Sequence, residues 1–241
     1  MPSIYLSPSA QEGNFYVTGQ SEEEVMNRLA DALEPYLREE GITFDRNSPS
    51  MGVNQIIRDS NRRNPDLHVA LHSNAAPDGE YGTKQGIFVY YYPGSADGKR
   101  AAEILADKLS EIYPDPALVR AAPLRSLGEL RYTDAPSVFL EVGFHDNLQD
   151  ANWNLNNLDS IAGKIAEGLE DYFDGENTGD IATVRTSTTG LNLRRAPNTG
   201  APTIASIPNG TRLRVTGGRN GWYRTNYNGQ TGYVSGRYLR F

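Results

Sequence analysis

The sequence predicts an α/β domain with a mostly parallel sheet flanked by helices, followed by a small all-β barrel. Two observations support this division. Up to Phe173, short apolar runs alternate with segments of helical periodicity, which is typical of strands joined by helices. Residues 181–241 instead contain short runs in which apolar and polar residues alternate, and these indicate a small barrel of antiparallel strands.

The charge of the chain changes sign between the same two parts. Residues 1–173 carry 14 Lys and Arg against 27 Asp and Glu, whereas residues 181–241 carry nine Arg and no acidic residue. We therefore expect one domain at 1–173, a linker at 174–180 and a second domain at 181–241. A basic domain of this kind indicates an anionic polymer as partner, which includes nucleic acid, an anionic membrane and wall polymers.

The elements of the first domain follow from periodicity and from capping signals. Ser21, with Glu24 three residues later, forms a capping box that begins a helix, and Gly41 follows the end of that helix. The other helices are expected at 51–63, 96–113 and 152–173. Strands are expected at 4–6, 42–44, 67–71, 86–92 and 137–141.

Composition excludes some classes of site. The chain has no cysteine, so a metal could be held only by His, carboxylate or amide groups. No apolar stretch approaches the roughly 20 residues that span a bilayer. Met1-Pro2-Ser3 leads directly into the first strand, without the basic and apolar segments of an export signal. We therefore expect no membrane span and no signal peptide in this chain.

Two ionisable residues lie in short apolar runs, His72 in Val69–Ala75 and Glu141 in Val138–Phe144. Such runs predict buried strands, and ligands of open α/β sheets bind at strand ends. The pair therefore indicates a metal site with an acid/base partner. The alternative is that both are polar residues whose hydrogen bonds are satisfied at strand ends.

His68 and His72 are four residues apart on an expected strand. At about 3.3 Å per residue the two rings lie roughly 13 Å apart, too far to share one ion. We therefore expect His68 to be structural and His72 to be the candidate ligand.

The first domain resembles the zinc-dependent N-acetylmuramoyl-L-alanine amidases, which cleave the bond between muramic acid and the stem peptide of peptidoglycan. The matching pieces occur in the same order across essentially the whole domain. They are Leu6–Ser9, Glu23 with Met26–Ala30, Arg46, Arg58–Asn61, Asp66–Ala75, Gly86, Leu130-Arg131, and Ala135–Phe144 with Asn147.

The resemblance implies a Zn²⁺ site and a role for each matching residue. Glu23 and His72 become metal ligands, Glu141 the catalytic base, and Asn74 and Arg131 substrate contacts. This chain departs from the family at the first ligand, because Gln11 occupies the place of a histidine. A neutral amide oxygen is a poorer zinc donor than imidazole, so Gln11, His145 or water could complete the site.

The second domain resembles the bacterial SH3-like domains found beside wall hydrolases. The matching pieces are Leu191–Pro197, Asn220–Arg224, Gly229–Val234 and Tyr238-Leu239. Trp222 and Tyr223 are candidates for stacking on sugars, although most aromatic residues of small barrels belong to the core.

Together these resemblances imply a monomeric peptidoglycan hydrolase that cleaves the amide between N-acetylmuramic acid and L-alanine. Its partners would be peptidoglycan and anionic wall polymers. The lack of an export signal resembles a phage endolysin, and a mature autolysin would look the same. One alternative is a non-catalytic wall-binding protein whose metal site is degenerate. Nucleic-acid binding by the basic domain is a third hypothesis. The acidic, amidase-like first domain has no role in such a function, so we favour the other two.

Overall fold

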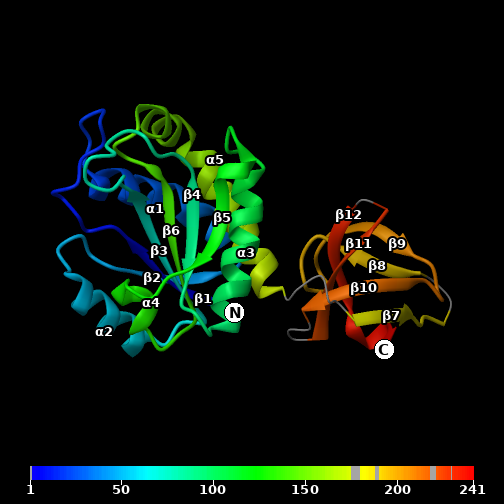
Figure 1. Ribbon diagram of the computed structural model, residues 1–241. Coiled ribbons are helices and arrows are strands. Elements are labelled where there is room, and N and C mark those ends of the chain that lie inside the picture. Colours follow the sequence, from blue (N-terminus) through cyan, green and yellow to red (C-terminus); the bar gives the residue numbers. More distant parts are fainter. Residues whose placement is uncertain (1, 175–179, 188–189, 218–220, 229) are drawn as a thin grey trace. The chain divides into compact units, whose positions relative to one another are not determined.

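The computed structural model describes residues 2–174, 180–187, 190–217, 221–228 and 230–241. Two compact units divide the chain, Met1–Glu170 and Asp171–Phe241. The expected linker at 174–180 falls largely outside the described residues (Figure 1). No helix of the described part is long and apolar enough to cross a membrane.

The first unit contains a six-stranded sheet in the order β2-β1-β3-β6-β4-β5. Four of the five strand pairs are parallel, and only β4 and β6 are antiparallel, so the expected mostly parallel sheet is confirmed. Its strands are β1 (Ser3–Pro8), β2 (Thr43–Arg46), β3 (Leu67–Asn74), β4 (Ile87–Tyr91), β5 (Val119–Pro123) and β6 (Ser137–Phe144).

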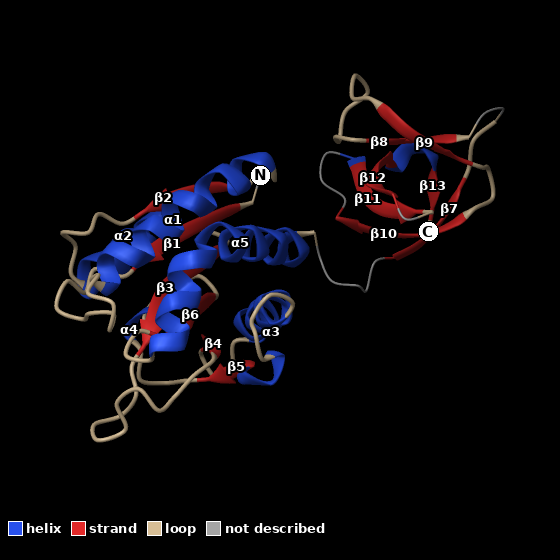
Figure 2. Ribbon diagram, turned by 90° about the horizontal axis from the view of Figure 1, so that it is seen from above, coloured by secondary structure: helices blue, strands red, loops and turns tan. Residues whose placement is uncertain are grey.

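Helices cover the two faces of this sheet unequally (Figures 1 and 2). The three long helices share one face, since Tyr36 of α1 contacts Gly163 of α5, and Leu105 of α3 contacts Gly168 of α5. The short helices α2 and α4 cover only part of the other face. The helices are α1 (Glu22–Glu39), α2 (Val53–Arg63), α3 (Ala96–Ser110), α4 (Gly128–Arg131) and α5 (Leu148–Phe173), which is kinked at Asn157.

Buried hydrogen bonds attach α2 and α4 to the sheet. The Tyr5 hydroxyl on β1 donates to Asp59 of α2 at 3.0 Å, and the Ser7 hydroxyl donates to Glu129 of α4 at 2.6 Å. Because alternate residues of a strand point to one face, the short helices share their face with Ala70, His72 and Phe139. The half of this face that they leave open is where the candidate site lies.

The sequence predicted most of these elements but not the edge of the sheet. Strand β5 and helix α4 were not expected. Their residues, 119–131, show no run long enough for a periodic signal. The reversal of β4 relative to β6 was also not predicted, since alternation of strands and helices favours parallel neighbours.

The last two residues of β6 fix the strand end that carries Glu141. Gly143 has φ +72°, a left-handed conformation, and a Cβ there would come within 3.2–3.3 Å of Asp150 and Asn154 on α5. Asp150 accepts hydrogen bonds from the Phe144 and Gly86 amides, at 2.8 and 3.0 Å, so it joins the end of β6 to the start of β4.

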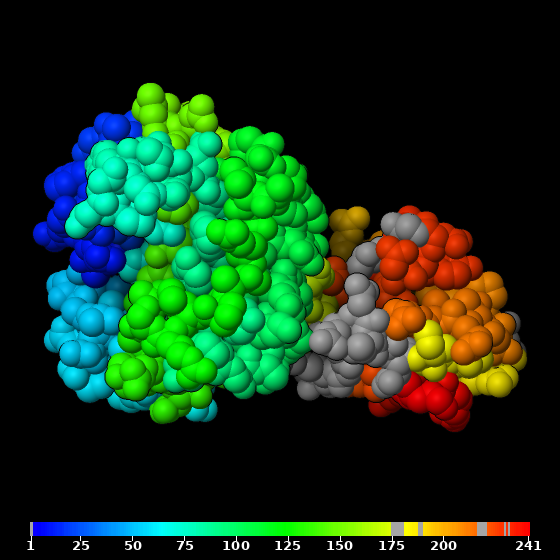
Figure 3. Space-filling view, viewed as in Figure 1, coloured from blue at the N-terminus to red at the C-terminus, as the bar shows by residue number. Residues whose placement is uncertain are grey.

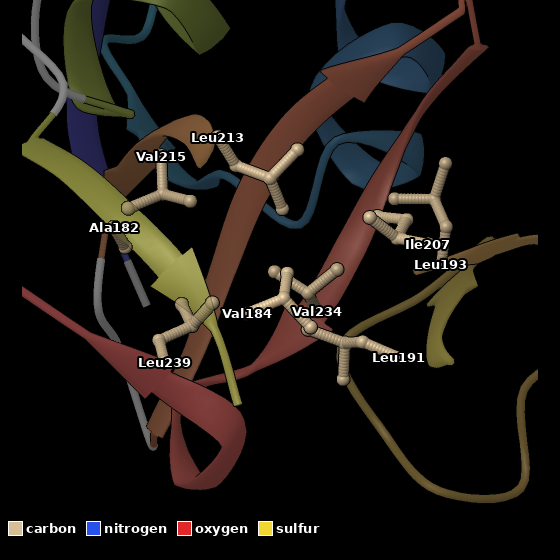
Figure 4. Packing of buried hydrophobic residues seen from close by; sticks show 9 residues of the cluster. All are labelled: Ala182, Val184, Leu191, Leu193, Ile207, Leu213, Val215, Val234 and Leu239. Carbon is tan, nitrogen blue, oxygen red and sulfur yellow. The ribbon is translucent and has the colours of Figure 1, made fainter. Parts of the chain in front are cut away.

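The second unit is a seven-stranded antiparallel sheet in the order β13-β7-β10-β11-β12-β8-β9, which confirms the expected SH3-like barrel. Its core is a cluster of aliphatic side chains drawn in Figure 4. The strands are β7 (Asp180–Val184), β8 (Leu191–Arg194), β9 (Thr203–Ile207), β10 (Arg212–Gly217), β11 (Trp222–Tyr227), β12 (Gln230–Ser235) and β13 (Leu239–Arg240).

Candidate active site

Four neighbouring strands place four side chains in one row on the open face of the sheet. His72 on β3 is in register with Glu141 on β6, Glu141 with Phe88 on β4, and Phe88 with Arg120 on β5. Residues directly opposite each other on paired strands point to the same face. The sequence motifs around His72 and Glu141, which are far apart in the chain, therefore meet side by side.

Glu22 is the carboxylate that contacts His72. Its Oε1 lies 2.8 Å from Nδ1 of His72 and accepts a hydrogen bond from the Ser73 amide at 3.3 Å. Its Oε2 accepts from the Asn14 side-chain amide at 2.8 Å. Glu22 is only 1% exposed, so this carboxylate is buried and its hydrogen bonds are satisfied by the site.

The carboxylate beside His72 belongs to Glu22, the neighbour of the expected ligand Glu23. Ser21 caps α1 by accepting from the Glu24 amide at 3.1 Å, so all three glutamates lie in the first turn. Glu22 precedes the buried Val25, Met26 and Leu29 by three, four and seven residues, which places it on the helix face that packs on the sheet. Glu23 is half-buried, and among the described residues only Glu22 and Glu129 bring a carboxylate to the His72 ring.

Gln11 does lie at the site, in the loop between β1 and α1. Its Nε2 is 3.3 Å from Nδ1 of His72, and its Oε1 accepts from Asn14 at 2.9 Å. Turning the amide group over exchanges its two terminal atoms and presents the oxygen to His72. The side chains of Gln11, Glu22 and His72 therefore converge on one point beside Nδ1.

The second ring nitrogen of His72 faces a carboxylate that the sequence analysis did not single out. Glu129 Oε1 lies 3.8 Å from Nε2 of His72, and Glu129 Oε2 lies 2.9 Å from Nε2 of His68. Glu129 is 5% exposed and also accepts from Ser7. His68 lies away from the donors that converge on Nδ1 of His72, as expected, but it shares Glu129 with His72.

The two carboxylates on either side of His72 govern its charge. Burial opposes the charged imidazolium, but Glu129 and Glu22 outweigh burial and raise the pKa of His72 to about 10. Burial alone would raise the pKa of Glu22, yet its hydrogen bond to His72 lowers it. In the metal-free protein a proton therefore occupies Nδ1, and metal ligation requires that this proton leave.

Glu141 is half-buried beside this cluster, and one of its carboxylate oxygens is buried without a hydrogen-bond partner. Its Oε2 is one of the few buried side-chain atoms of the described residues that have no hydrogen-bond partner. Burial raises the pKa of Glu141 to about 8, with nearby Glu22 adding to the effect and His72 opposing it. A carboxyl group in such surroundings is suited to accept and release a proton near neutral pH.

The other predicted site residues lie at various distances from this centre. Asn74 lies near Tyr90, because it lowers the pKa of Tyr90 while burial and Glu141 raise it, so Asn74 is at the site. His145 directs Nδ1 to Ser73, at 3.1 Å from the hydroxyl and 3.0 Å from the carbonyl oxygen, rather than to His72 or Glu22. Arg131 is exposed at the end of α4, over the ring of Tyr132.

The aromatic candidates of the second unit are only partly available for stacking. Tyr223 packs against the barrel core, and its ring centroid lies 5.2 Å from that of Phe241. Trp222 is half-buried on β11, opposite Ser235 of β12. The more exposed aromatic residues of this unit are Tyr238, at 47%, and Phe241, at 63%.

The donors beside Nδ1 of His72 fit a divalent metal ion. No group of three or more His, Asp or Glu side chains able to hold an ion occurs among the described residues. A third donor would therefore be of another type, and the amide of Gln11 lies where it could supply one. Imidazole, carboxylate and amide oxygen together would be three protein donors, the number that catalytic zinc sites use beside water.

Glu129→Gln is expected to lower the affinity of the site for Zn²⁺ by about 10- to 100-fold, because carboxylates that orient a ligand histidine contribute that much. Chelator competition measures the affinity, and thermal unfolding checks that the fold is retained. Glu24→Gln is the control, because Glu24 is exposed on α1. Equal metal affinity in the two variants would show that Glu129 does not position His72.

Comparison with protein families agrees with this geometry. Residues 9–171 match the N-acetylmuramoyl-L-alanine amidase family, and residues 189–240 match the bacterial SH3 domain family. The first match covers more than half of the chain and includes the whole open face of the sheet. The chain therefore belongs to the N-acetylmuramoyl-L-alanine amidase family, whose reaction is hydrolysis of the amide between muramic acid and L-alanine in peptidoglycan.

Solved structures with the same fold include three peptidoglycan hydrolases. An N-acetylmuramoyl-L-alanine amidase from Clostridium difficile 630 has 19% identity and a TM-score of 0.64, and the match covers 72% of this chain and 97% of that one. The catalytic domain of CwlV from Bacillus (Paenibacillus) polymyxa has 17% identity and a TM-score of 0.63, over 72% and 99%.

The catalytic domain of an endolysin targeting Clostridia difficile has 23% identity and a TM-score of 0.58, over 70% and 97% of the two chains. At these identities the likeness concerns the fold. A comparison with curated proteins gave no match.

Proposed function

We propose that this amidase is zinc-dependent, and that Gln11, Glu22 and His72 hold the ion while Glu141 acts as the base. The observation that carries the proposal is the placement of Glu141 in register with His72, with a buried oxygen that has no hydrogen-bond partner. A bound Zn²⁺ would polarise the lactyl carbonyl of the substrate and acidify a water molecule.

Glu141 performs the proton transfers of the reaction. Its Oε2 accepts the proton of the attacking water and later delivers it to the nitrogen of the departing L-alanine. Asn74 and Tyr90, beside Glu141, are placed to orient the substrate. Glu129 holds the His72 ring in place from the opposite side.

The SH3-like unit is proposed to bind the wall. The nine arginines and absent acids of residues 181–241 attract anionic wall polymers. Such attraction between exposed charges is screened beyond about 8–10 Å at physiological salt. This unit would therefore concentrate the enzyme on its substrate in a salt-dependent way, and the chain would act at the cell wall.

Product analysis after digestion of purified walls tests both proposals. We expect new free amino groups on alanine and no new reducing ends. The rate on intact walls should fall with salt more steeply than the rate on a soluble muramoyl peptide. New reducing sugars would identify a glycosidase instead. If the two rates depended equally on salt, the second unit would not bind the wall through its charge.

A non-catalytic wall-binding protein is the second candidate, and the replacement of a ligand histidine by Gln11 is the observation that favours it. The same digestion separates the two candidates, because a binding protein would pellet with walls and release no amino groups.

A further inference from the structure

Four arginines of the acidic first unit differ from its other Lys and Arg residues in forming no ion pair among the described residues. The remaining Lys and Arg side chains of residues 1–173 each form an ion pair with a carboxylate. Arg58, Arg120, Arg125 and Arg131 have no such partner among the described residues. In a unit with an excess of carboxylates, unpaired guanidinium groups are free to bind an anionic ligand.

Three of these arginines lie over aromatic rings, and two of the rings belong to β4 and the residue that follows it. The guanidinium carbon of Arg120 is 4.3 Å from the ring centroid of Phe88, and that of Arg125 is 5.9 Å from the centroid of Tyr92. Arg131 lies 5.2 Å from the ring of Tyr132. A ring under the guanidinium fixes its plane and leaves its N–H groups accessible to an incoming anion.

Arg120 belongs to the same row of side chains as the proposed base. It is in register with Phe88, which is in register with Glu141, so two strand spacings separate Arg120 from Glu141. At about 4.7–4.9 Å per spacing this is roughly 10 Å. Phe88 lies between them, and Tyr90 is one residue pair further along the same face of β4, in register with Phe139 and Ala122.

The surface that leads away from Glu141 is therefore lined by cations and aromatic rings. Phe88, Tyr90 and Tyr92 alternate along one face of β4 and its continuation, and all three are half-buried. In Figure 3, residues of β5 and the segment after it (green) lie below the loop that follows β3 (teal) on the side of the molecule in view.

We propose that Arg120, assisted by Arg125, binds a free carboxylate of the peptidoglycan stem peptide and makes the enzyme selective for stem peptides that carry one. This inference rests on the proposed amidase function. An extended peptide advances at most about 3.3–3.6 Å per residue, so Arg120 is reached about three residues beyond the cleaved bond. A carboxylate on a stem-peptide residue at that separation would pair with Arg120, and amidation would remove its charge.

The test compares two soluble muramoyl peptides that differ only at this carboxylate, which is free in one and amidated in the other. We expect the wild-type protein to cleave the free acid with a higher kcat/KM. Arg120→Gln should lower kcat/KM on the free acid by about fivefold, and Arg120→Gln with Arg125→Gln by more than that, mainly through KM. The amidated peptide should be cleaved at an unchanged rate, and Arg120→Lys should retain part of the selectivity.

Arg38→Gln is the matched control, because Arg38 also lies over an aromatic ring, Phe44, at 5.0 Å, on the β2 side of the sheet. Equal kcat/KM of the wild type and the double variant on the free acid would overturn the inference. If the wild type cleaves neither peptide, the proposed function fails. Calorimetric binding of the two free stem peptides then decides the role of Arg120 without turnover, since loss of the preference in Arg120→Gln supports it and an unchanged affinity refutes it.

Discussion

Glu141→Gln is expected to reduce hydrolysis of the muramoyl–L-alanine amide by about 10²- to 10⁴-fold, which is the usual contribution of a positioned base. Zinc content and fold should be unchanged, because the donors that converge on the Nδ1 side of His72 come from Glu22 and Gln11. Turnover of a soluble muramoyl peptide, together with metal analysis, measures both effects. Loss of metal along with activity would make Glu141 a ligand and refute its role as base.

Glu141→Gln should also change how the stability of the folded protein depends on pH, because burial raises the pKa of Glu141. Burial raises the pKa of this carboxyl in the folded protein to about 8, from an ordinary value near 4.5. Because the folded protein holds the proton more tightly than the unfolded chain, the stability that Glu141 contributes is present below about pH 4.5 and is lost as the pH rises to about 8. Metal-free wild type should therefore lose stability relative to Glu141→Gln over this range in chemical denaturation. Parallel pH profiles would contradict this.

Glu22→Gln and Glu23→Gln form a matched pair that tests the metal site. We expect Glu22→Gln to lower Zn²⁺ affinity by at least about 100-fold, because it removes the charged oxygen donor beside His72. Glu23→Gln should leave the affinity unchanged. Both substitutions remove one negative charge from the first turn of α1, so their effects through the helix dipole are alike. Chelator competition on the purified full-length chain measures both, and the reverse order of effects would restore Glu23 as the ligand.

The limits of the sequence analysis are clearest at this run of three glutamates. The capping signal at Ser21 correctly began α1, and Glu22, Glu23 and Glu24 were then equivalent as residue types. The phase of the helix distinguishes them, because Val25, Met26 and Leu29 define its buried face and only Glu22 has buried residues at both +3 and +4. That signal is present in the sequence, and it singles out Glu22 as the glutamate that faces the sheet.

Glu129 could not be found in the same way. It lies in a four-residue helix, too short for a periodic pattern, and its importance comes from His68 and His72, which belong to a strand much earlier in the chain. Spacing along β3 predicted that the two histidine rings lie too far apart for one ion, whereas one carboxylate reaches both rings in the structure. That spacing could not show that a buried carboxylate from α4 would lie between them.

The groups proposed for catalysis and the groups proposed for substrate selection lie on different strands, because β4 and β5 run opposite to β6. The groups proposed to carry out the reaction come from β3, β6, the start of α1 and the loop before it, whereas the arginine and aromatic side chains proposed to select the substrate come from β4, β5 and the segment that follows. Because β5 is the edge strand, it has only β4 as a neighbour in the sheet. Grafting a different β4–β5 unit onto this chain would then change which walls are digested while the chemistry stayed the same, so this edge of the sheet is the place to redirect the enzyme toward other bacteria.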